Sequence, residues 1–334
     1  MLETSNPKAI ISWLKVCAAV VFTIVVIGGI TRLTRSGLSI VEWKPVSGVI
    51  PPTSEADWQT EFDKYKQTPE YRLVNRSMTL NEFKNIFWWE FIHRIFARLV
   101  GVIFFLPFIW FLLRRQISRR FALKLAAIFA LGGVQGFLGW YMVKSGLVND
   151  PHVNHLRLMS HLMTAVLIYA LVLMTAWGLD QRPAVPGSRR LAWVNVILVF
   201  VMMASGALVA GLKAGKMYNT FPLMNGQYFP QGALGFSPVL VNFYDNPIMI
   251  QFLHRNFAYA LGLFFFWQIW RERKTLHLYH PLLWIVLLYT VQFVLGIFTL
   301  LKAVPVMLGA LHQANGLFLF TATLHLLARR QYAS

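Results

Sequence analysis

Residues 90–101 read EFIHRIFARLVG, and residues 251–262 read QFLHRNFAYALG. Both stretches carry a histidine–arginine pair at the start of an apolar run. They differ at the first residue, which is Glu90 in one copy and Gln251 in the other. A long segment that recurs within one chain indicates an internal repeat. The fold therefore has to accommodate two similar halves.

The composition is that of a membrane protein. Of the 334 residues, 57% are hydrophobic and only 13% are charged, so most helical surface has to face a medium other than water. Apolar runs of about 20 residues, long enough to cross a bilayer, occur eight times. They span residues 10–31, 88–113, 121–143, 157–179, 190–211, 248–270, 281–301 and 306–328. The sequence predicts an all-α integral membrane protein with eight transmembrane helices.

Basic residues gather on one side of these predicted helices. They occur in LLRRQISRRFALK (112–124), DQRPAVPGSRR (180–190), RERK (271–274) and ARR (328–330). The positive-inside rule makes this side cytoplasmic, with both termini inside. The net charge is +18. The basic residues flank the predicted spans and do not form a soluble domain with a binding face, which argues against a nucleic-acid partner. An acidic N-terminus that leads directly into a full-length apolar run favours a multi-pass protein of the bacterial cytoplasmic membrane over an imported organellar one.

The repeat extends beyond the opening pair. VQGFLGWYMVKSG (134–146) parallels VQFVLGIFTLLKA (291–303), and RLMSHLMTAVLIY (157–169) parallels GALHQANGLFLF (309–320). We expect two tandem four-helix bundles, residues 1–180 and 181–334, related by a pseudo-two-fold axis along the membrane normal. The outer loop at 32–87 is long, and its spaced aromatic and charged residues predict a short interfacial helix.

Four histidines occupy matching positions in the two halves: His93, His161, His254 and His312. In each half, one lies near the outer end of the second predicted span and the other near the outer end of the fourth. Two imidazoles at equal depth in one bundle are suited to axial ligation of haem iron. The alternative is that each histidine is a hydrogen-bonded helix contact, but ionisable groups within a membrane are costly and usually functional.

The residues beside these histidines suggest further roles. Arg94 and Arg255 each follow a candidate ligand, and a guanidinium there can pair with a haem propionate; the alternative is snorkelling to the surface. Glu90 shares a helix face with His93, so it can accept or relay protons, or it can simply hold the His93 imidazole. Gln251 cannot ionise. The first half therefore reads as the reactive site and the second as a site of electron storage.

Several stretches resemble the haem A synthases: SGLSIVEWKPVSGVIPP (36–52), EFDKYKQTPEY (61–71), NEFKNIFWWEFIHR (81–94), GWYMVKSGL (139–147) and RLMSHL (157–162). The resemblance implies oxidation of a ring methyl group of haem O to a formyl group, which makes haem A for cytochrome oxidase. It places substrate haem in the N-terminal half and haem B in the C-terminal half. Some members carry a cysteine pair in an outer loop, whereas this chain has a single cysteine, Cys17.

The partners expected on this basis are haem O delivered by haem O synthase, an unidentified electron donor and membrane lipids; homo-oligomerisation is left open. Two other functions account for part of the pattern. A di-haem electron carrier of the cytochrome b type explains four histidines, and a haem transporter or chaperone explains substrate binding without chemistry. The residues also leave open whether the inserted oxygen comes from dioxygen or from water.

Overall fold

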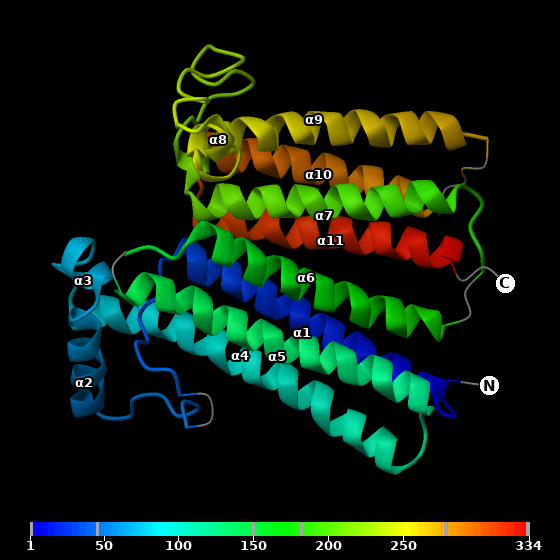
Figure 1. Cartoon of the computed structure of the whole chain (residues 1–334), viewed down its shortest axis with the longest axis horizontal. Helices are drawn as coiled ribbons and strands as arrows, with labels where there is room; N and C mark the ends of the chain where they lie inside the picture. The colour runs from blue at the N-terminus through cyan, green and yellow to red at the C-terminus, as the bar shows by residue number, and fades with distance from the viewer. Residues whose placement is uncertain are drawn as a thin grey trace. The chain divides into compact units, whose positions relative to one another are not determined.

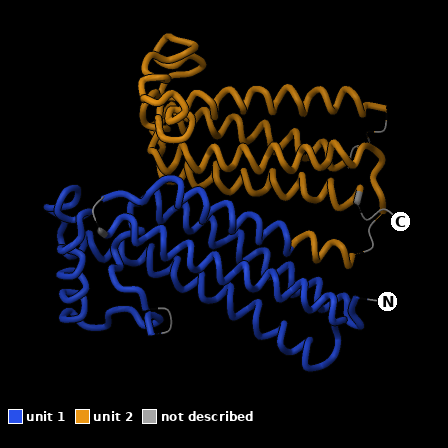
Figure 2. The backbone as a smooth tube through the Cα atoms, in the orientation of Figure 1, with its two compact units in different colours: residues 1–172 blue, residues 173–334 orange. Residues whose placement is uncertain are grey.

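The structure is a computed structural model that describes residues 3–44, 47–148, 151–180, 183–274, 276 and 280–331. Within these ranges the chain forms eleven α-helices and two short 3₁₀ helices, and no strand (Figure 1). The all-helical prediction is confirmed. The helices divide into two compact units, residues 1–172 and 173–334 (Figure 2). This boundary falls within a helix, whereas the predicted halves, 1–180 and 181–334, place it after that helix.

Unit 1 is built from four long helices and a pair of short ones. Helix α1 packs on α4, α4 packs on α5, and the short helices contact α4 and α5. Figure 1 shows α2 and α3 at one end of the long helices. The bounds are α1 (Pro7–Leu33), α2 (Glu55–Lys66), α3 (Pro69–Leu73), α4 (Leu80–Leu113), α5 (Arg119–Val148) and α6 (His155–Gly178), whose last turns belong to unit 2.

Unit 2 has four long helices of its own. Helix α7 packs on α9 and α11, and α10 packs on α9 and α11. A segment with two 3₁₀ turns and the single-turn α8 joins α7 to α9. The bounds are α7 (Arg189–Gly211), η1 (Ala214–Lys216), η2 (Val239–Val241), α8 (Asn242–Asp245), α9 (Pro247–Glu272), α10 (Pro281–Leu301) and α11 (Val306–Gln331).

The eight long helices coincide with the eight apolar runs. Among the described residues, six of them are long and apolar enough to cross a membrane: α1, α4, α5, α6, α7 and α10. The other two, α9 and α11, are 26 residues each and also exceed the length of a bilayer crossing. That they cross the membrane stays a prediction.

Helix α4 begins at Leu80, well before the apolar run that starts at residue 88. Thr79 and Glu82 form a capping box: the Thr79 hydroxyl accepts from the Glu82 amide, and the Glu82 carboxylate accepts from the Thr79 amide at 2.7 Å. This reciprocal cap satisfies amides that the first turn would leave unpaired. The helix therefore extends by about two turns beyond its apolar part, towards α2.

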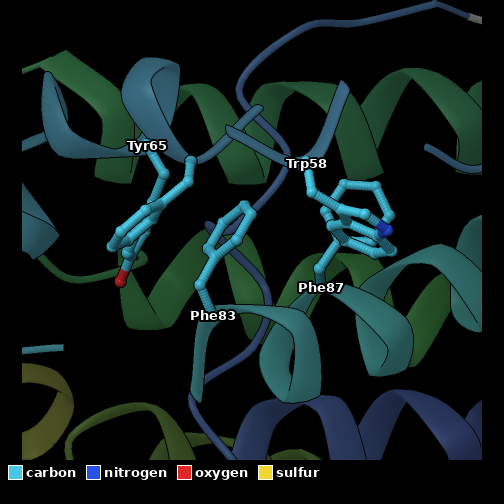
Figure 3. Close-up of a cluster of buried hydrophobic side chains, with 5 residues drawn as sticks. Trp58, Tyr65, Phe83 and Phe87 are labelled. Carbon is cyan, nitrogen blue, oxygen red and sulfur yellow. The ribbon is translucent and has the colours of Figure 1, made fainter. Parts of the chain in front are cut away.

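An aromatic cluster holds α2 against the start of α4 (Figure 3). Tyr65 stacks on Phe83 with ring centroids 5.3 Å apart, and Trp58 meets Phe87 edge-to-face at 5.0 Å. Both geometries are favourable for aromatic pairs. The predicted short helix in the loop at 32–87 is thus present, but its aromatic face is buried on α4. It is therefore closed to lipid, unlike the face of an interfacial helix.

A buried ion pair joins α9 to α11 in unit 2. Glu272 and Arg330 are paired, and both side chains are almost fully buried. Arg330 also donates to the carbonyls of Ser188 (3.0 Å) and Pro186 (3.2 Å), just before α7. A guanidinium with several fixed acceptors is a strong link between segments. Three parts of unit 2 that are distant in sequence thereby meet at one side chain.

Candidate functional site

In unit 1, His93 of α4 and His161 of α6 each lie against a glycine of another helix. A Cβ atom added at Gly28 of α1 would lie 3.2 Å from His93 Nε2, and one added at Gly139 of α5 would lie 2.9 Å from His161 Cε1. Both distances are shorter than an ordinary van der Waals contact, so a larger residue at either glycine would crowd the imidazole ring. The two imidazoles are close enough to interact electrostatically.

Unit 2 repeats this arrangement at the matching positions. A Cβ atom added at Gly206 of α7 would lie 3.3 Å from His254 Cε1, and one added at Gly296 of α10 would lie 3.1 Å from His312 Cε1. His254 and His312 also lie within electrostatic range of each other. The structure thus brings together the histidines of each predicted pair, His93 with His161 and His254 with His312. Their role as iron ligands stays a prediction.

The histidines of unit 2 are held by polar side chains. Ser205 Oγ lies 2.7 Å from His254 Nδ1, which leaves Nε2 of that ring for another partner. Gln292 Nε2 lies 3.2 Å from His312 Nε2, and Asn315 in turn donates to Gln292 Oε1 at 2.9 Å. A hydrogen bond to one ring nitrogen fixes the orientation of the imidazole and so aims the other nitrogen.

The matching positions of unit 1 lack these partners. Ile27 corresponds to Ser205 and has no hydrogen-bonding side chain. Thr164 corresponds to Asn315, and its hydroxyl donates to Ser160 of its own helix at 2.8 Å. Gln135, which corresponds to Gln292, has a buried Oε1 with no hydrogen-bond partner in the described part of the chain. The imidazoles of unit 1 are therefore less constrained by side chains than those of unit 2.

Glu90 lies one helical turn from His93 and is only 3% exposed. Its Oε2 accepts from the Ser39 hydroxyl (2.7 Å) and the Ile40 amide (2.9 Å), and its Oε1 accepts from Arg94 Nε (3.1 Å) and Nη2 (2.7 Å). A buried carboxylate needs such donors to offset its desolvation. Its partners are thus the outer loop and Arg94, and none of these four bonds comes from His93.

Gln251 occupies the equivalent place in unit 2 with different contacts. Its Nε2 donates to the Tyr218 carbonyl at 3.0 Å, and its Oε1 is buried without a hydrogen-bond partner among the described residues. Arg255 does not bond to Gln251. It donates instead to the carbonyls of Tyr218 (2.7 Å) and Thr220 (2.8 Å), and its Nε is buried and unpartnered in the same sense.

The two predicted propionate-binding arginines hold loop backbone in this structure. Arg94 donates to the carbonyls of Ile40 (2.7 Å) and Glu42 (2.9 Å) as well as to Glu90. All three of its nitrogens therefore have protein partners. Arg255 has an unpartnered nitrogen and is the better placed of the two for an additional carboxylate. Propionate pairing stays a prediction for both.

The residues present fit haem better than a bare metal ion. The described residues contain no group of three or more His, Cys, Asp or Glu side chains that could hold a metal. Iron that carries its own macrocycle needs only one or two protein ligands. Nδ1 of His161 and Nδ1 of His312 are buried with no hydrogen-bond partner in the described ranges, so each has a nitrogen free to bind iron. His93 with His161, and His254 with His312, would hold the two haems.

Sequence reasoning missed the residues that support the histidines. Ser205, Gln292, Asn315 and the four glycines act across helices, and Ser39 acts from a loop. A signal was available for some of them, because Gln135 and Gln292 occupy the same place in the repeated VQ segments. Ser39, which donates to Glu90, had no such signal, since it lies outside the repeated segments.

Comparison with known proteins places this geometry in a family. Residues 11–324 match the family model described as cytochrome oxidase assembly protein (COX15-CtaA). The chain belongs to this family. It is 46% identical over 335 residues to a protein named "Heme A synthase" from Nitrosomonas eutropha, with 96% of this chain and 93% of the relative covered. Proteins of the same name from Nitrosospira multiformis and Rhodospirillum centenum are 47% and 48% identical, over 95% and 97% of this chain and 92% and 90% of theirs.

Membership of the cytochrome oxidase assembly family covers both units. The matched region includes all four histidines, their four glycines and Glu90. The similarity therefore extends over the complete candidate sites and is not confined to one half. Two matched histidine pairs, one of them beside a buried carboxylate, therefore lie within the region that matches the family.

Proposed function

We propose that this chain is a haem A synthase of a bacterial cytoplasmic membrane. It oxidises a ring methyl group of haem O to a formyl group and so makes haem A for cytochrome oxidase. The carrying observation is the difference between two otherwise matched sites: a buried carboxylate, Glu90, stands beside His93, and an amide, Gln251, stands beside His254. Relatives of nearly full length carry the name of this enzyme, which supports the same conclusion.

The substrate haem belongs in unit 1, between His93 and His161. Oxidation of a methyl group to a formyl group adds one oxygen atom and removes two hydrogen atoms, a four-electron change. With water as the oxygen source, four protons are released and an electron acceptor has to take the four electrons. With dioxygen in two successive hydroxylations, an electron donor has to reduce the second oxygen atom of each dioxygen to water. Glu90 is the residue that takes a proton at its carboxylate, because it is the acidic side chain on the His93 face of α4. Ser39, Ile40 and Arg94 position that carboxylate.

Haem B belongs in unit 2, held by His254 and His312. Bound there, it supplies reversible one-electron transfer. Ser205 holds His254, and the Asn315–Gln292 pair holds His312, which suits a resident cofactor. The histidines of unit 1 lack matching partners, which suits a haem that enters as substrate and leaves as product.

The membrane arrangement has eight spans, with α9 and α11 crossing alongside the six most apolar helices. An even number puts both termini on the cytoplasmic side, where the basic residues lie. The matched histidine–glycine contacts support two similar halves, 1–180 and 181–334; the repeat in the sequence predicts a pseudo-two-fold axis along the membrane normal between them. Haem O synthase delivers the substrate, and an electron donor completes the reaction.

Pigment extraction tests this function against its alternatives. We expect cells that supply haem O and express this chain to yield haem A or its hydroxylated intermediate, separated by chromatography. A di-haem electron carrier also explains the paired histidines, but it predicts haem B in both units and no new pigment. A haem transporter predicts that haem O leaves unchanged. Recovery of unchanged haem O, with neither haem A nor its hydroxylated intermediate, from an intact protein that also carries haem B would refute the proposal.

A further inference from the structure

The segment that joins α7 to α9 contains no charged residue from Met217 to Tyr244. It starts at the end of α7, one of the helices apolar enough to span a membrane, so it emerges at a membrane surface. Figure 1 shows it as the looped chain around α8 at one end of unit 2. A charge-free stretch of this length is unusual for a loop that faces water.

The segment exposes apolar side chains that a water-facing loop would bury. Seven large ones are between 46% and 75% exposed. Isolated exposed apolar residues are ordinary, but a contiguous group of them marks a contact surface. The seven are Met217, Tyr228, Phe229, Leu234, Val239, Leu240 and Phe243.

The irregular backbone of the segment is held from inside by two buried asparagines. Asn242 is fully buried: its Oδ1 accepts from the Phe236 amide (2.9 Å), and its Nδ2 donates to the Phe236 carbonyl (2.8 Å). Asn246, 1% exposed, donates to the Gly232 carbonyl and to Asn242 Oδ1, both at 2.8 Å. Amides that satisfy backbone groups from inside let an irregular segment tolerate a medium with few hydrogen-bond partners.

We propose that residues 217–244 lie in the outer interfacial layer of the lipid bilayer, with their apolar side chains among the lipids. The charge-free sequence and the exposed large apolar side chains are unusual beside water, and match a medium of low polarity. Tyrosine and phenylalanine side chains suit this layer because the ring is apolar and the tyrosine hydroxyl reaches water. Lipid is preferred to a protein partner because the segment is continuous with α7 and carries no charge to select a partner.

The outer loop of unit 1 provides the matched contrast. Helix α2 carries six charged residues among its twelve, and its aromatic side chains are buried on α4. The two outer loops therefore differ at their surfaces: one buries its aromatic side chains beneath charged residues, and the other carries no charge from 217 to 244 and exposes large apolar side chains.

The lipid-facing segment is tied to the proposed haem site of unit 2. Arg255, next to His254, donates to the carbonyls of Tyr218 and Thr220 at its start. The bilayer surface thus supports the backbone that surrounds this arginine. The proposal concerns placement only and stands whether or not the chain makes haem A.

Fluorescence quenching in vesicles tests the placement. Leu240→Cys and Phe243→Cys would each be labelled with an NBD fluorophore in the full-length protein, with Asp63→Cys on α2 as the control; the native Cys17 is buried, and unsubstituted protein gives the labelling background. The vesicles contain phosphatidylethanolamine and phosphatidylglycerol. An interfacial element lies about 5–10 Å deep, so the quenchers are a lipid with a doxyl group at carbon 5 and aqueous iodide.

We expect the doxyl lipid to quench the probes at 240 and 243 at least about twofold more than the control, and iodide to show the reverse order. Iodide quenching at 240 and 243 equal to that at 63 would overturn the proposal, because the segment would then be in water. Quenching by neither agent would also overturn it. If neither agent quenches at a high protein-to-lipid ratio, but quenching appears as that ratio is lowered, a second copy of this chain covers the surface.

Discussion

Replacement of Glu90 by glutamine should separate proton transfer from structure. The carboxylate accepts four hydrogen bonds, from Ser39, from the Ile40 amide and twice from Arg94. Glutamine keeps one acceptor oxygen, so about two of these donors lose their partner. At about 1 kcal/mol for each lost hydrogen bond, and with Arg94 keeping its backbone acceptors but losing its carboxylate partner, stability should fall by about 2–3 kcal/mol.

The effect on catalysis is separate from this cost in stability. Loss of a positioned acid–base group lowers turnover by about 100-fold or more, or about 2.7 kcal/mol of activation free energy. Ser39→Ala is the matched control, because it removes one donor to the same carboxylate and keeps the charge. We expect it to lower turnover by less than about tenfold, the equivalent of one hydrogen bond.

The assay is haem A formed per protein, with haem B content measured in the same extract. Glu90→Gln should lose haem A and keep haem B. Gln251→Glu should keep turnover within a few-fold, because it places a carboxylate one turn from Arg255, whose Nε is unpartnered among the described residues. Equal losses from Glu90→Gln and Ser39→Ala would refute proton transfer by Glu90. Equal losses from Glu90→Gln and Gln251→Glu would refute the division of roles between the halves.

Other changes test the remaining assignments. His254→Ala should abolish the low-spin absorbance spectrum of haem B and lower the haem-to-protein ratio, because one of two imidazole ligands is lost; an unchanged spectrum excludes it as a ligand. Ser205→Ala should weaken haem B retention by about tenfold or more, measured by transfer to apomyoglobin, because the His254 ring loses its hydrogen bond; a shift in reduction potential should accompany it. Arg255→Leu should loosen haem B or shift its potential if a propionate pairs there, and unchanged values would favour a purely structural arginine. Phe83→Ala should lower the stability of unit 1 by about 3–5 kcal/mol, measured by thermal unfolding, because this fully buried ring fills the centre of the aromatic cluster.

The long helices could be predicted because a membrane-spanning helix appears in the sequence as a continuous apolar run. Helical turns that extend beyond this run give no such signal. The first turns of α4 are polar, so only the Thr79–Glu82 cap marks its true start at Leu80. The four histidines could be found because the repeat aligns them, and a duplicated ionisable residue in an apolar run is conspicuous.

The contacts around the histidines could not be predicted in the same way. Ser205 contacts His254 from another helix, and a single serine in an apolar run does not by itself indicate a functional contact. The role of Arg94 depends on where the Ile40 and Glu42 carbonyls lie, and local sequence does not encode that position. Contacts between side chains of different helices can be identified only when the packing of those helices is known.

The link between Glu272 and Arg330 has a consequence for how the protein is made. Glu272, at the end of α9, is synthesised many residues before Arg330, so the ion pair between them can form only after α11 has been made. The same holds for the hydrogen bonds from Arg330 to the backbone carbonyls of Pro186 and Ser188. The contacts that join α9, α11 and the segment before α7 through this side chain therefore become available only at the end of synthesis.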